Sequence, residues 1–191
     1  MIMKGIYVFL ADGFEDIEAL APVDVLRRAG LEVTLVSLSA DCSAVSSHGV
    51  TVLTDLSLEE LELSHEGTSA TDFLIFPGGM PGSKSLSECE PLISLMQAHY
   101  DNGGSLAAIC AAPGLVLSRL EGISGKRFTC YDGFQDRTIA AGGVFDPQSA
   151  VADGRIVTGR GAGYALAFAE KILSCISPSA LAKVHAGMFL E

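Results

Sequence analysis

The chain has 191 residues, of which 49% are hydrophobic and 18% are charged, and it contains 21 glycines. This balance is typical of a compact α/β domain with many tight turns and argues against a disordered chain. The net charge of −11 argues against nucleic acid or an anionic membrane surface as a partner and favours solubility. We therefore expect one domain over residues 1–191 that binds neither nucleic acid nor membranes.

The amino-terminal segment and the cysteines predict the compartment. The segment MIMKGIYVFLADGFEDIE has one lysine, and its apolar run stops at Asp12. That run is too short and too soon acidic for a secretory signal, and no apolar stretch of 18 residues exists elsewhere. The five cysteines are odd in number, widely spaced and without a CxxC pair. Free thiols in a reducing compartment are the simplest interpretation, so we expect a cytoplasmic protein.

The first forty residues predict a β-α-β unit. Residues 4–10 form a short apolar run that ends at the turn ADG and indicate a buried strand. A helical stripe of apolar side chains follows and ends at Gly30, and residues 31–39 are rich in the β-branched side chains that strands favour. Two strands joined by a helix are expected to lie parallel.

The rest of the chain continues the alternation of strands and helices. Residues 44–71 predict a hairpin around Ser47–Gly49, followed by an acidic loop or helix. Residues 72–82 predict a strand that runs into the glycine-rich turn PGGMPG, and SLAAI at 105–109 predicts another strand. The remaining expected strands cover 127–130, 149–152 and 155–158, and the remaining helices cover 88–101, 163–176 and 178–186. This pattern predicts an open parallel sheet with helices on both faces.

Cys110 lies where the predicted strand SLAAI meets a helix. Proline clashes in a helix interior but is tolerated in the first turn, so Pro113 places the start of this helix at about Ala111. The small residues around Cys110 suit a crowded turn such as a nucleophile elbow. At such a corner the amides of a helix N-terminus favour a thiolate, and ligands bind at this edge of parallel sheets. An isolated cysteine beside a strand is usually a small buried residue, and the corner alone leaves both interpretations open.

Two further stretches converge on the same edge of the sheet. The turn PGGMPG follows a buried strand, so the backbone N–H groups of this turn could form an oxyanion hole. Acidic residues at a helix N-terminus usually interact with the helix dipole, and this is the simpler interpretation of Glu15 and Asp16. Glu18 lies deeper in the helix, where burial would raise its pKa and let the carboxyl donate a hydrogen bond to a thiolate.

Taken together, these segments resemble the DJ-1/ThiJ/PfpI family. The stretches ADGFEDIEALAPVDVLRRAG, FPGGMPG, LAAICAAPGLVL and TGRGAGYALAFA stand in the order and spacing of that family. The resemblance covers nearly the whole chain. It implies a class I glutamine amidotransferase-like, flavodoxin-like α/β fold, a three-layer α/β/α sandwich with a mostly parallel sheet.

The resemblance also implies roles for individual residues. Cys110 would be the reactive cysteine and Glu18 the protonated carboxyl beside it. The backbone amides of Gly79 and Ala111 would form the oxyanion hole. The other residues that the resemblance places in the pocket or at the interface of a homodimer are Gly78, Arg28, His48, Tyr131 and Arg160.

Two departures from the family concern a histidine that assists the cysteine in some relatives. Ala111 follows Cys110 where protease-like or amidase-like relatives have a histidine, and Tyr131 stands where other members have one. His48 falls where some relatives have an arginine. The four histidines, at positions 48, 65, 99 and 185, match neither place. No Cys–His pair for acyl transfer is visible, so we do not expect peptidase activity.

The resemblance implies two alternative functions. The first is a stress-protective enzyme that acts on small reactive carbonyls, converting methylglyoxal to lactate without glutathione or repairing early glycation adducts. The second is an oxidation sensor or chaperone-like protein in which Cys110 is oxidised to sulfinic acid without turnover. No cofactor is implied, and the sequence has no HExxH motif or clustered His/Cys spacing for a metal. A role in thiamine metabolism, which the older family name suggests, has no support because TGRGAG is a lone glycine-rich turn.

Overall fold

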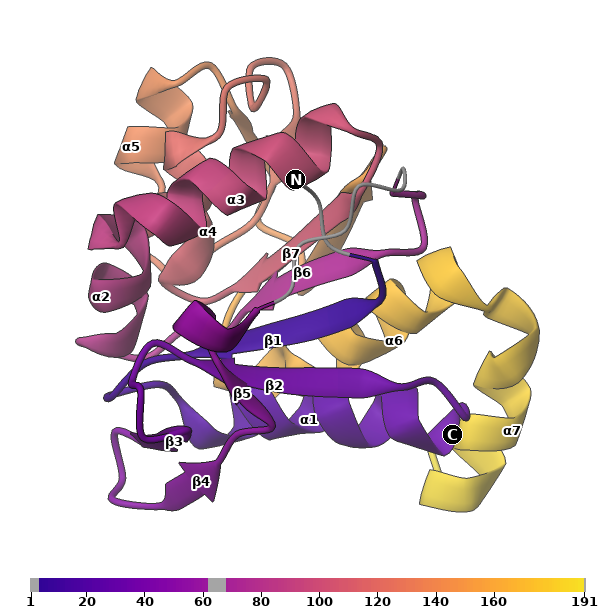
Figure 1. Ribbon diagram of the computed structural model, residues 1–191. Helices are drawn as coiled ribbons and strands as arrows, with labels where there is room; N and C mark the ends of the chain where they lie inside the picture. The colour runs from indigo at the N-terminus through magenta and orange to yellow at the C-terminus, as the bar shows by residue number, and fades with distance from the viewer. Residues whose placement is uncertain (1–3, 62–67, 191) are drawn as a thin grey trace.

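A seven-stranded sheet forms the centre of the computed structural model, which describes residues 4–61 and 68–190 (Figure 1). Its strands are β1 (Ile6–Leu10), β2 (Val33–Ser37), β5 (Leu56–Ser57), β6 (Phe73–Phe76), β7 (Ser105–Ile109), β10 (Ala150–Asp153) and β11 (Ile156–Gly159). They are ordered β10-β11-β7-β6-β1-β2-β5, and all pairs are parallel except β10 with β11. The parallel sheet expected from the sequence is confirmed.

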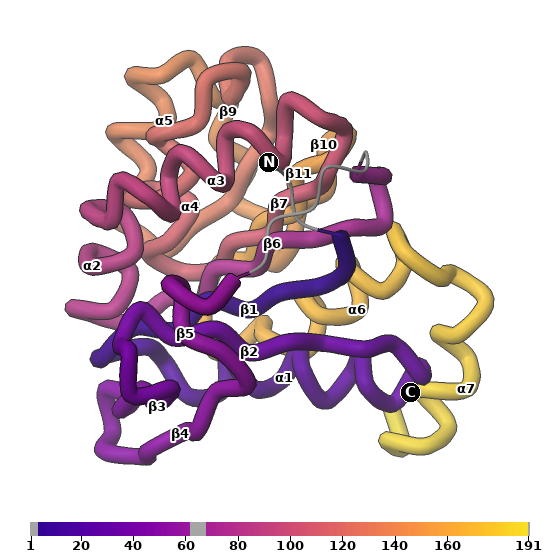
Figure 2. Tube along the Cα trace, viewed as in Figure 1, coloured from indigo at the N-terminus to yellow at the C-terminus, as the bar shows by residue number. Residues whose placement is uncertain are grey.

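Helices cover both faces of this sheet, which makes a three-layer α/β/α sandwich (Figures 1 and 2). One face carries α1 (Asp16–Arg28) and α6 (Ala165–Ile176), with α7 (Leu181–Met188) next to α6. The other face carries α2 (Gly82–Glu88), α3 (Glu90–Asp101) and α4 (Ala112–Leu115). The flavodoxin-like fold class is therefore confirmed. No helix among the residues that the structure describes is both long enough and apolar enough to cross a membrane.

Alternate side chains of the central strands serve two separate cores. In β1, Val8 packs with α1 and α6, whereas Phe9 points to the opposite face and stacks on Phe76 with ring centroids 5.6 Å apart. In β6, Ile75 joins the first core and Phe76 the second. Successive residues of a strand point to opposite faces, so strands covered on both sides read as continuous apolar runs.

The hairpin predicted around Ser47–Gly49 is present. It consists of β3 (Ser43–Val45) and β4 (Thr51–Leu53), which pair antiparallel. The acidic stretch after it is more complex than the expected loop or helix, because it begins with the edge strand β5 and a 3₁₀ turn over Leu58–Glu60. Residues 62–67 of that stretch, with His65 among them, lie outside the described residues.

Several predicted boundaries were wrong. The strand expected over 127–130 is β8 (Arg127–Phe128), which pairs with β9 (Val144–Phe145) in a separate sheet. The helix expected over 88–101 is α3, and the sequence interpretation missed α2 directly before it. The helix after Cys110 has Ala111 as its N-cap, as Pro113 predicted, but α4 is only four residues long. A short helix α5 (Asp136–Ala140) was also not expected.

Candidate active site

The candidate active site lies at the carboxyl ends of β1, β6 and β7. The chain leaves β1 toward β2 on one side and later returns to β6 on the other, so β1 and β6 flank the switch point of the sheet. Ligands of open parallel sheets bind at this place. Glu18 follows β1 on α1, the pair Gly78–Gly79 follows β6, and Cys110 follows β7. The topology thus brings three distant segments to one edge.

Cys110 occupies a strained corner. Its φ is 63°, in the left-handed region that costs an L-residue about 1–2 kcal/mol. Its N–H donates to the Gly159 carbonyl of β11 at 3.0 Å, and its carbonyl accepts from the Tyr131 N–H at 2.8 Å. These bonds on both sides hold the corner in place. The strand-to-helix corner predicted from Pro113 is confirmed.

Two glycines allow the turn after β6 to approach this corner. The Gly78 N–H donates to Glu18 Oε2 at 3.0 Å, and the Gly78 carbonyl accepts from the Glu15 N–H at 3.0 Å. A Cβ on Gly78 would overlap Glu18 Oε2 and the Cβ of Cys110. Gly79 has a φ of +88°, and a Cβ there would overlap the backbone of residues 13–15. Glycine is therefore needed at both positions for close packing.

Glu18 is fully buried, and its two oxygens differ. Oε2 accepts the Gly78 hydrogen bond, whereas Oε1 has no hydrogen-bond partner among the described residues. Burial, and to a smaller extent the nearby charge of Glu15, raise the pKa of Glu18 to about 7. The Cys110 thiol and the Gly78 amide act in the opposite direction. The expectation that burial raises this pKa is confirmed.

The Cys110 thiol behaves differently from the expectation. Burial, and then the negative charge of Glu18, raise the pKa of Cys110 to about 12. Backbone amides of Ala111 and Gly79 hydrogen-bond to the sulfur and act to lower that pKa. They are outweighed by burial of the sulfur and by the carboxyl of Glu18 next to it. Glu18 therefore ionises first, and at neutral pH the thiol keeps its proton while the carboxylate beside it can accept one.

A pocket of about 350 Å³ lies over Tyr131 and Arg160, and neither Cys110 nor Glu18 is among the residues that line it. Two of the predicted residues, Tyr131 and Arg160, line it. The full lining is Tyr131, Asp132, Arg160, Gly161, Ala162, Gly163 and Tyr164. The Arg160 guanidinium is held at 2.8 Å by both Asp132 Oδ1 and the carbonyl of Pro147. The pocket adjoins Cys110 through the backbone, since the Tyr131 N–H binds the Cys110 carbonyl.

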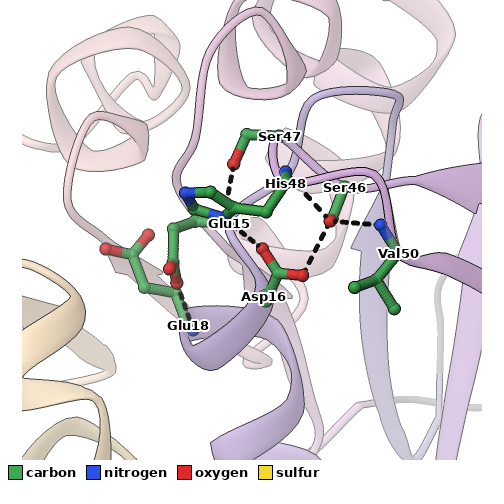
Figure 3. Close-up of polar contacts among 7 residues, drawn as sticks. All are labelled: Glu15, Asp16, Glu18, Ser46, Ser47, His48 and Val50. Carbon is green, nitrogen blue, oxygen red and sulfur yellow. Dashed lines mark hydrogen bonds and ion pairs between the residues drawn. The ribbon is translucent and has the colours of Figure 1, made fainter.

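His48 lies near the N-terminus of α1, where Asp16 holds it (Figure 3). Its Nδ1 is 2.6 Å from Asp16 Oδ2, and Asp16 Oδ1 accepts from the Ser46 hydroxyl at 2.7 Å. Glu15 is the N-cap of α1, and its carboxylate accepts the Glu18 N–H at 2.8 Å. The prediction that Glu15 serves the N-terminus of this helix is confirmed. The sequence interpretation missed the partner of Asp16, because no local pattern links residues 32 positions apart.

Comparison with known proteins identifies the family. The model of the DJ-1/PfpI family matches residues 4–175. The chain belongs to the DJ-1/PfpI family. It is 36% identical over 169 residues to protein dj-1beta of Drosophila melanogaster, covering 88% of this chain and 87% of that protein. The crystal structure of Drosophila melanogaster DJ-1beta superposes with a TM-score of 0.86 at 32% identity and covers all of both chains.

The name of a second relative states an enzymatic activity. The glutathione-independent glyoxalase DJR-1.2 of Caenorhabditis elegans is 31% identical over 162 residues, which cover 85% of this chain and 82% of that protein. Some relatives are longer. The chain spans only 37% of the DJ-1 homolog B of Arabidopsis thaliana, to which it is 32% identical over 89% of its own length.

Arg28, which the family resemblance placed in the pocket or at a dimer interface, lies away from Cys110 within the chain. Arg28 lies in the last turn of α1 and pairs with Asp24, its Nε donating to Oδ2 at 2.7 Å. Ten residues of helix separate it from Glu18, a rise of about 15 Å. Arg28 therefore does not line the Cys110 pocket, and its role at a homodimer interface stays a prediction.

The histidines described by the structure do not form a Cys–His pair. His48 binds Asp16, the Nε2 of His99 lies 3.1 Å from the Asp72 carbonyl, and His185 lies 3.0 Å from Glu170. The basic group beside the Cys110 thiol is therefore the carboxyl of Glu18 and not a histidine.

We predict that Gly78→Ala lowers the free energy of unfolding by about 1–3 kcal/mol, the usual cost of overpacking a buried site. The added methyl group would have to displace Glu18 or Cys110. Urea unfolding followed by circular dichroism measures the loss. Gly163→Ala is the matched control, because a Cβ there meets nothing within 4 Å. Equal stabilities of both variants would contradict the close approach at Gly78.

We predict that Glu18→Gln becomes more stable relative to the wild type as pH rises. A carboxyl whose folded pKa is raised from 4.5 to about 7 stays protonated in the folded state while the unfolded state ionises. The folded state therefore loses stability between these two values, by about 3 kcal/mol in total. Glutamine does not ionise and avoids that loss.

Urea unfolding at pH 4.5, 6 and 8 tests this prediction. The stability of Glu18→Gln minus that of the wild type should grow by about 3 kcal/mol across the series. Glu32→Gln, at an exposed position, is the control. A difference that stays constant with pH would show that Glu18 titrates normally.

Proposed function

We propose that the protein is a cysteine-dependent enzyme that converts small 2-oxoaldehydes such as methylglyoxal to 2-hydroxy acids without glutathione. The observation that carries the proposal is the buried Glu18 carboxyl, whose Oε1 has no partner among the described residues, beside the Cys110 thiol. The activity named for the C. elegans relative supports the same chemistry.

The first step is addition of the thiol to the aldehyde. Cys110 Sγ forms a bond to the aldehyde carbon while the Glu18 carboxylate accepts the thiol proton. With a pKa of about 7, Glu18 is suited to accept and return a proton at neutral pH. The carbonyl oxygen gains the negative charge next to the sulfur, where the amides of Gly79 and Ala111 are directed. Return of the proton to this oxygen gives a hemithioacetal.

The second step moves hydrogen within the substrate. Glu18 removes the proton from the former aldehyde carbon and returns it to the neighbouring carbon. The first carbon is thereby oxidised to a thioester, and the second is reduced to an alcohol, so no external oxidant is needed. Water then hydrolyses the thioester, which releases lactate and restores the Cys110 thiol.

The chain would act as a homodimer in the cytoplasm. Exposed apolar side chains on α1 and on the β3–β4 hairpin support an interface on this side of the molecule. They are Ile17, Leu20, Val45 and Leu53. The ribbon diagram shows the hairpin beside the amino-terminal half of α1 (Figure 1).

The proposed activity is tested by lactate formation from methylglyoxal in the absence of glutathione. Cys110→Ala should abolish it, because no covalent adduct can form, and Glu18→Ala should lower kcat at least about a hundredfold. Cys175→Ala, which removes an exposed thiol on α6, should keep wild-type activity. Wild-type turnover by Cys110→Ala would refute the proposal.

The second candidate function is sensing of oxidation by Cys110. The free Glu18 Oε1 could hydrogen-bond an oxygen added to the sulfur, and one structural neighbour at 28% identity is described as an oxidized DJ-1 of Toxoplasma gondii. Limiting peroxide should then add two oxygen atoms to the Cys110 peptide, as measured by mass spectrometry. Oxidation of Cys42 or Cys175 with unmodified Cys110 would exclude this function.

A further inference from the structure

Another pocket lies at the edge of the sheet that β10 forms. It has a volume of about 330 Å³ and lies between α6, α7 and the segment that enters β10. β10 and β5 are the two edges of the sheet, and the β3–β4 hairpin lies near the β5 edge (Figure 1). This pocket shares no lining residue with the pocket over Tyr131 and Arg160, and Cys110 and Glu18 do not line it. It is therefore separate from the candidate active site.

The lining of this pocket is mostly polar. Six of its nine residues have polar or charged side chains, namely Gln148, Ser149, Glu170, Lys171, Ser174 and His185. Pockets for drug-like ligands are lined mainly by apolar side chains, with a few polar groups that orient the ligand. A polar lining and a volume of about 330 Å³ suit a small hydrophilic molecule instead.

Lys171 lines this pocket without a partner among the described residues. Four of their cationic side chains are half-buried, at positions 126, 155, 160 and 171. Lys126 and Arg160 pair with aspartates, and Arg155 donates to backbone carbonyls and lies over the Tyr100 ring. The Lys171 ammonium makes no hydrogen bond or ion pair with a described residue. In a chain with a net charge of −11, this half-buried charge is the exception.

The spacing of charges on α6 explains why Lys171 is unpaired. Side chains three or four residues apart on a helix are neighbours, whereas adjacent side chains do not face each other. None of the residues three or four positions from Lys171 is acidic: they are Ala167, Phe168, Ser174 and Cys175. Glu170 directly precedes Lys171, and its Oε1 lies 3.0 Å from His185 Nε2 instead.

Lys171 also lines a smaller adjoining pocket of about 130 Å³. The acidic side chain of this second pocket is Asp146, whose Oδ2 lies 3.6 Å from Arg127 Nη1. Each acidic side chain that lines the two pockets thus has a basic partner other than Lys171. One positive charge remains for a ligand.

Ser149 provides a hydrogen-bond donor from the opposite wall. Its backbone carbonyl accepts the Arg160 N–H at 3.0 Å, which continues the pairing of β10 with β11 and fixes its position. Its hydroxyl has no partner among the described residues, whereas the Ser174 hydroxyl donates to the Lys171 carbonyl at 2.7 Å. An ammonium on α6 and a free hydroxyl at the start of β10 are both suited to acceptor oxygens.

We propose that this pocket binds a small hydroxylated carboxylate, with the ligand carboxylate at Lys171 and a hydrogen bond from Ser149. One unpaired positive charge matches one negative charge, and the carboxylates of Glu170 and Asp146 disfavour a dianion such as a phosphate ester. The polar lining suits hydroxyl groups on the rest of the ligand. The proposal goes beyond the proposed function, because no step of that reaction uses these residues.

Three compounds with the same number of carbon atoms test the proposal. Glycerate carries one negative charge, glycerol carries none and glycerol 3-phosphate carries about two. Binding is measured by the shifts of backbone amides in proton–nitrogen correlation NMR spectra. We expect glycerate to shift the amides of Ser149, Ala150 and Lys171 in the millimolar range, and glycerol to leave them unchanged.

Two results of this titration would overturn the proposal. Without shifts of these amides by glycerate, Lys171 would be a lysine whose ammonium is simply solvated at the surface. Tighter binding of glycerol 3-phosphate than of glycerate would overturn the assignment to carboxylates.

Variants test the role of each donor. Lys171→Gln should weaken glycerate binding at least about tenfold, because it removes the charge-assisted hydrogen bond. Lys171→Arg keeps the charge and should bind within about threefold of the wild type, and Ser149→Ala should bind about threefold more weakly. Lys183→Gln, which removes an exposed lysine of α7 that lines neither pocket, is the matched control. Equal affinities of Lys171→Gln and the wild type would contradict the site.

The variant Cys110→Ala separates this site from the candidate active site. It should bind glycerate as the wild type does, because Cys110 lines neither pocket. Loss of the glycerate shifts in this variant would place the anion at the active site and overturn the proposal. Lactate formation from methylglyoxal has no bearing on either result, so the proposed function and this site can fail independently.

Discussion

The absence of a side chain at Gly78 is the constraint on which the candidate site depends. Its amide reaches Glu18, its carbonyl accepts the Glu15 N–H, and its α-carbon leaves no room for a methyl group beside Cys110. Three strand ends that are far apart in sequence therefore meet within hydrogen-bond distance. The parallel sheet brings these ends to one edge, but the glycine lets their side chains touch. The strained φ of Cys110 is tolerated because β11 and Tyr131 hold its peptide groups on both sides.

Burial of Glu18 links stability to chemistry. An ionised carboxyl in this position destabilises the fold, and the same burial moves its pKa to the neutral range, where a proton-transfer group is most effective. Its charge also holds the proton on Cys110. In the proposed mechanism the nucleophile is therefore a thiol with a base beside it rather than a free thiolate. Such a pair would ionise the sulfur only when an electrophile arrives, as acyl-transfer enzymes do with a histidine.

The sequence predicted those features that depend on local chemistry. Pro113 located the end of the strand and thus the corner at Cys110, and alternating strands and helices predicted the parallel sheet. The position of Glu18 in its helix suggested an approach to the thiol, and the family resemblance supported it. The effect of Glu18 on the thiol pKa was missed because that effect depends on distance. Arg28 lies at the opposite end of α1 from Glu18, and its alternative role at a homodimer interface stays a prediction because the single chain does not show a partner. The contact between Asp16 and His48 joins separate elements and has no local signal.

The acidic residues at the start of α1 set the electrostatic environment of Glu18. The described histidines bind elsewhere, so in the proposed mechanism proton transfer falls to Glu18, which lies near Glu15 and Asp16 on the same helix. Burial is the larger cause of the raised pKa of Glu18, and the charge of Glu15 adds to it. Asp16 differs from Glu18, because its hydrogen bonds to Ser46 and His48 lower its pKa. Two carboxyl groups two residues apart on one helix are therefore shifted in opposite directions, one by solvated hydrogen-bond partners and the other by burial.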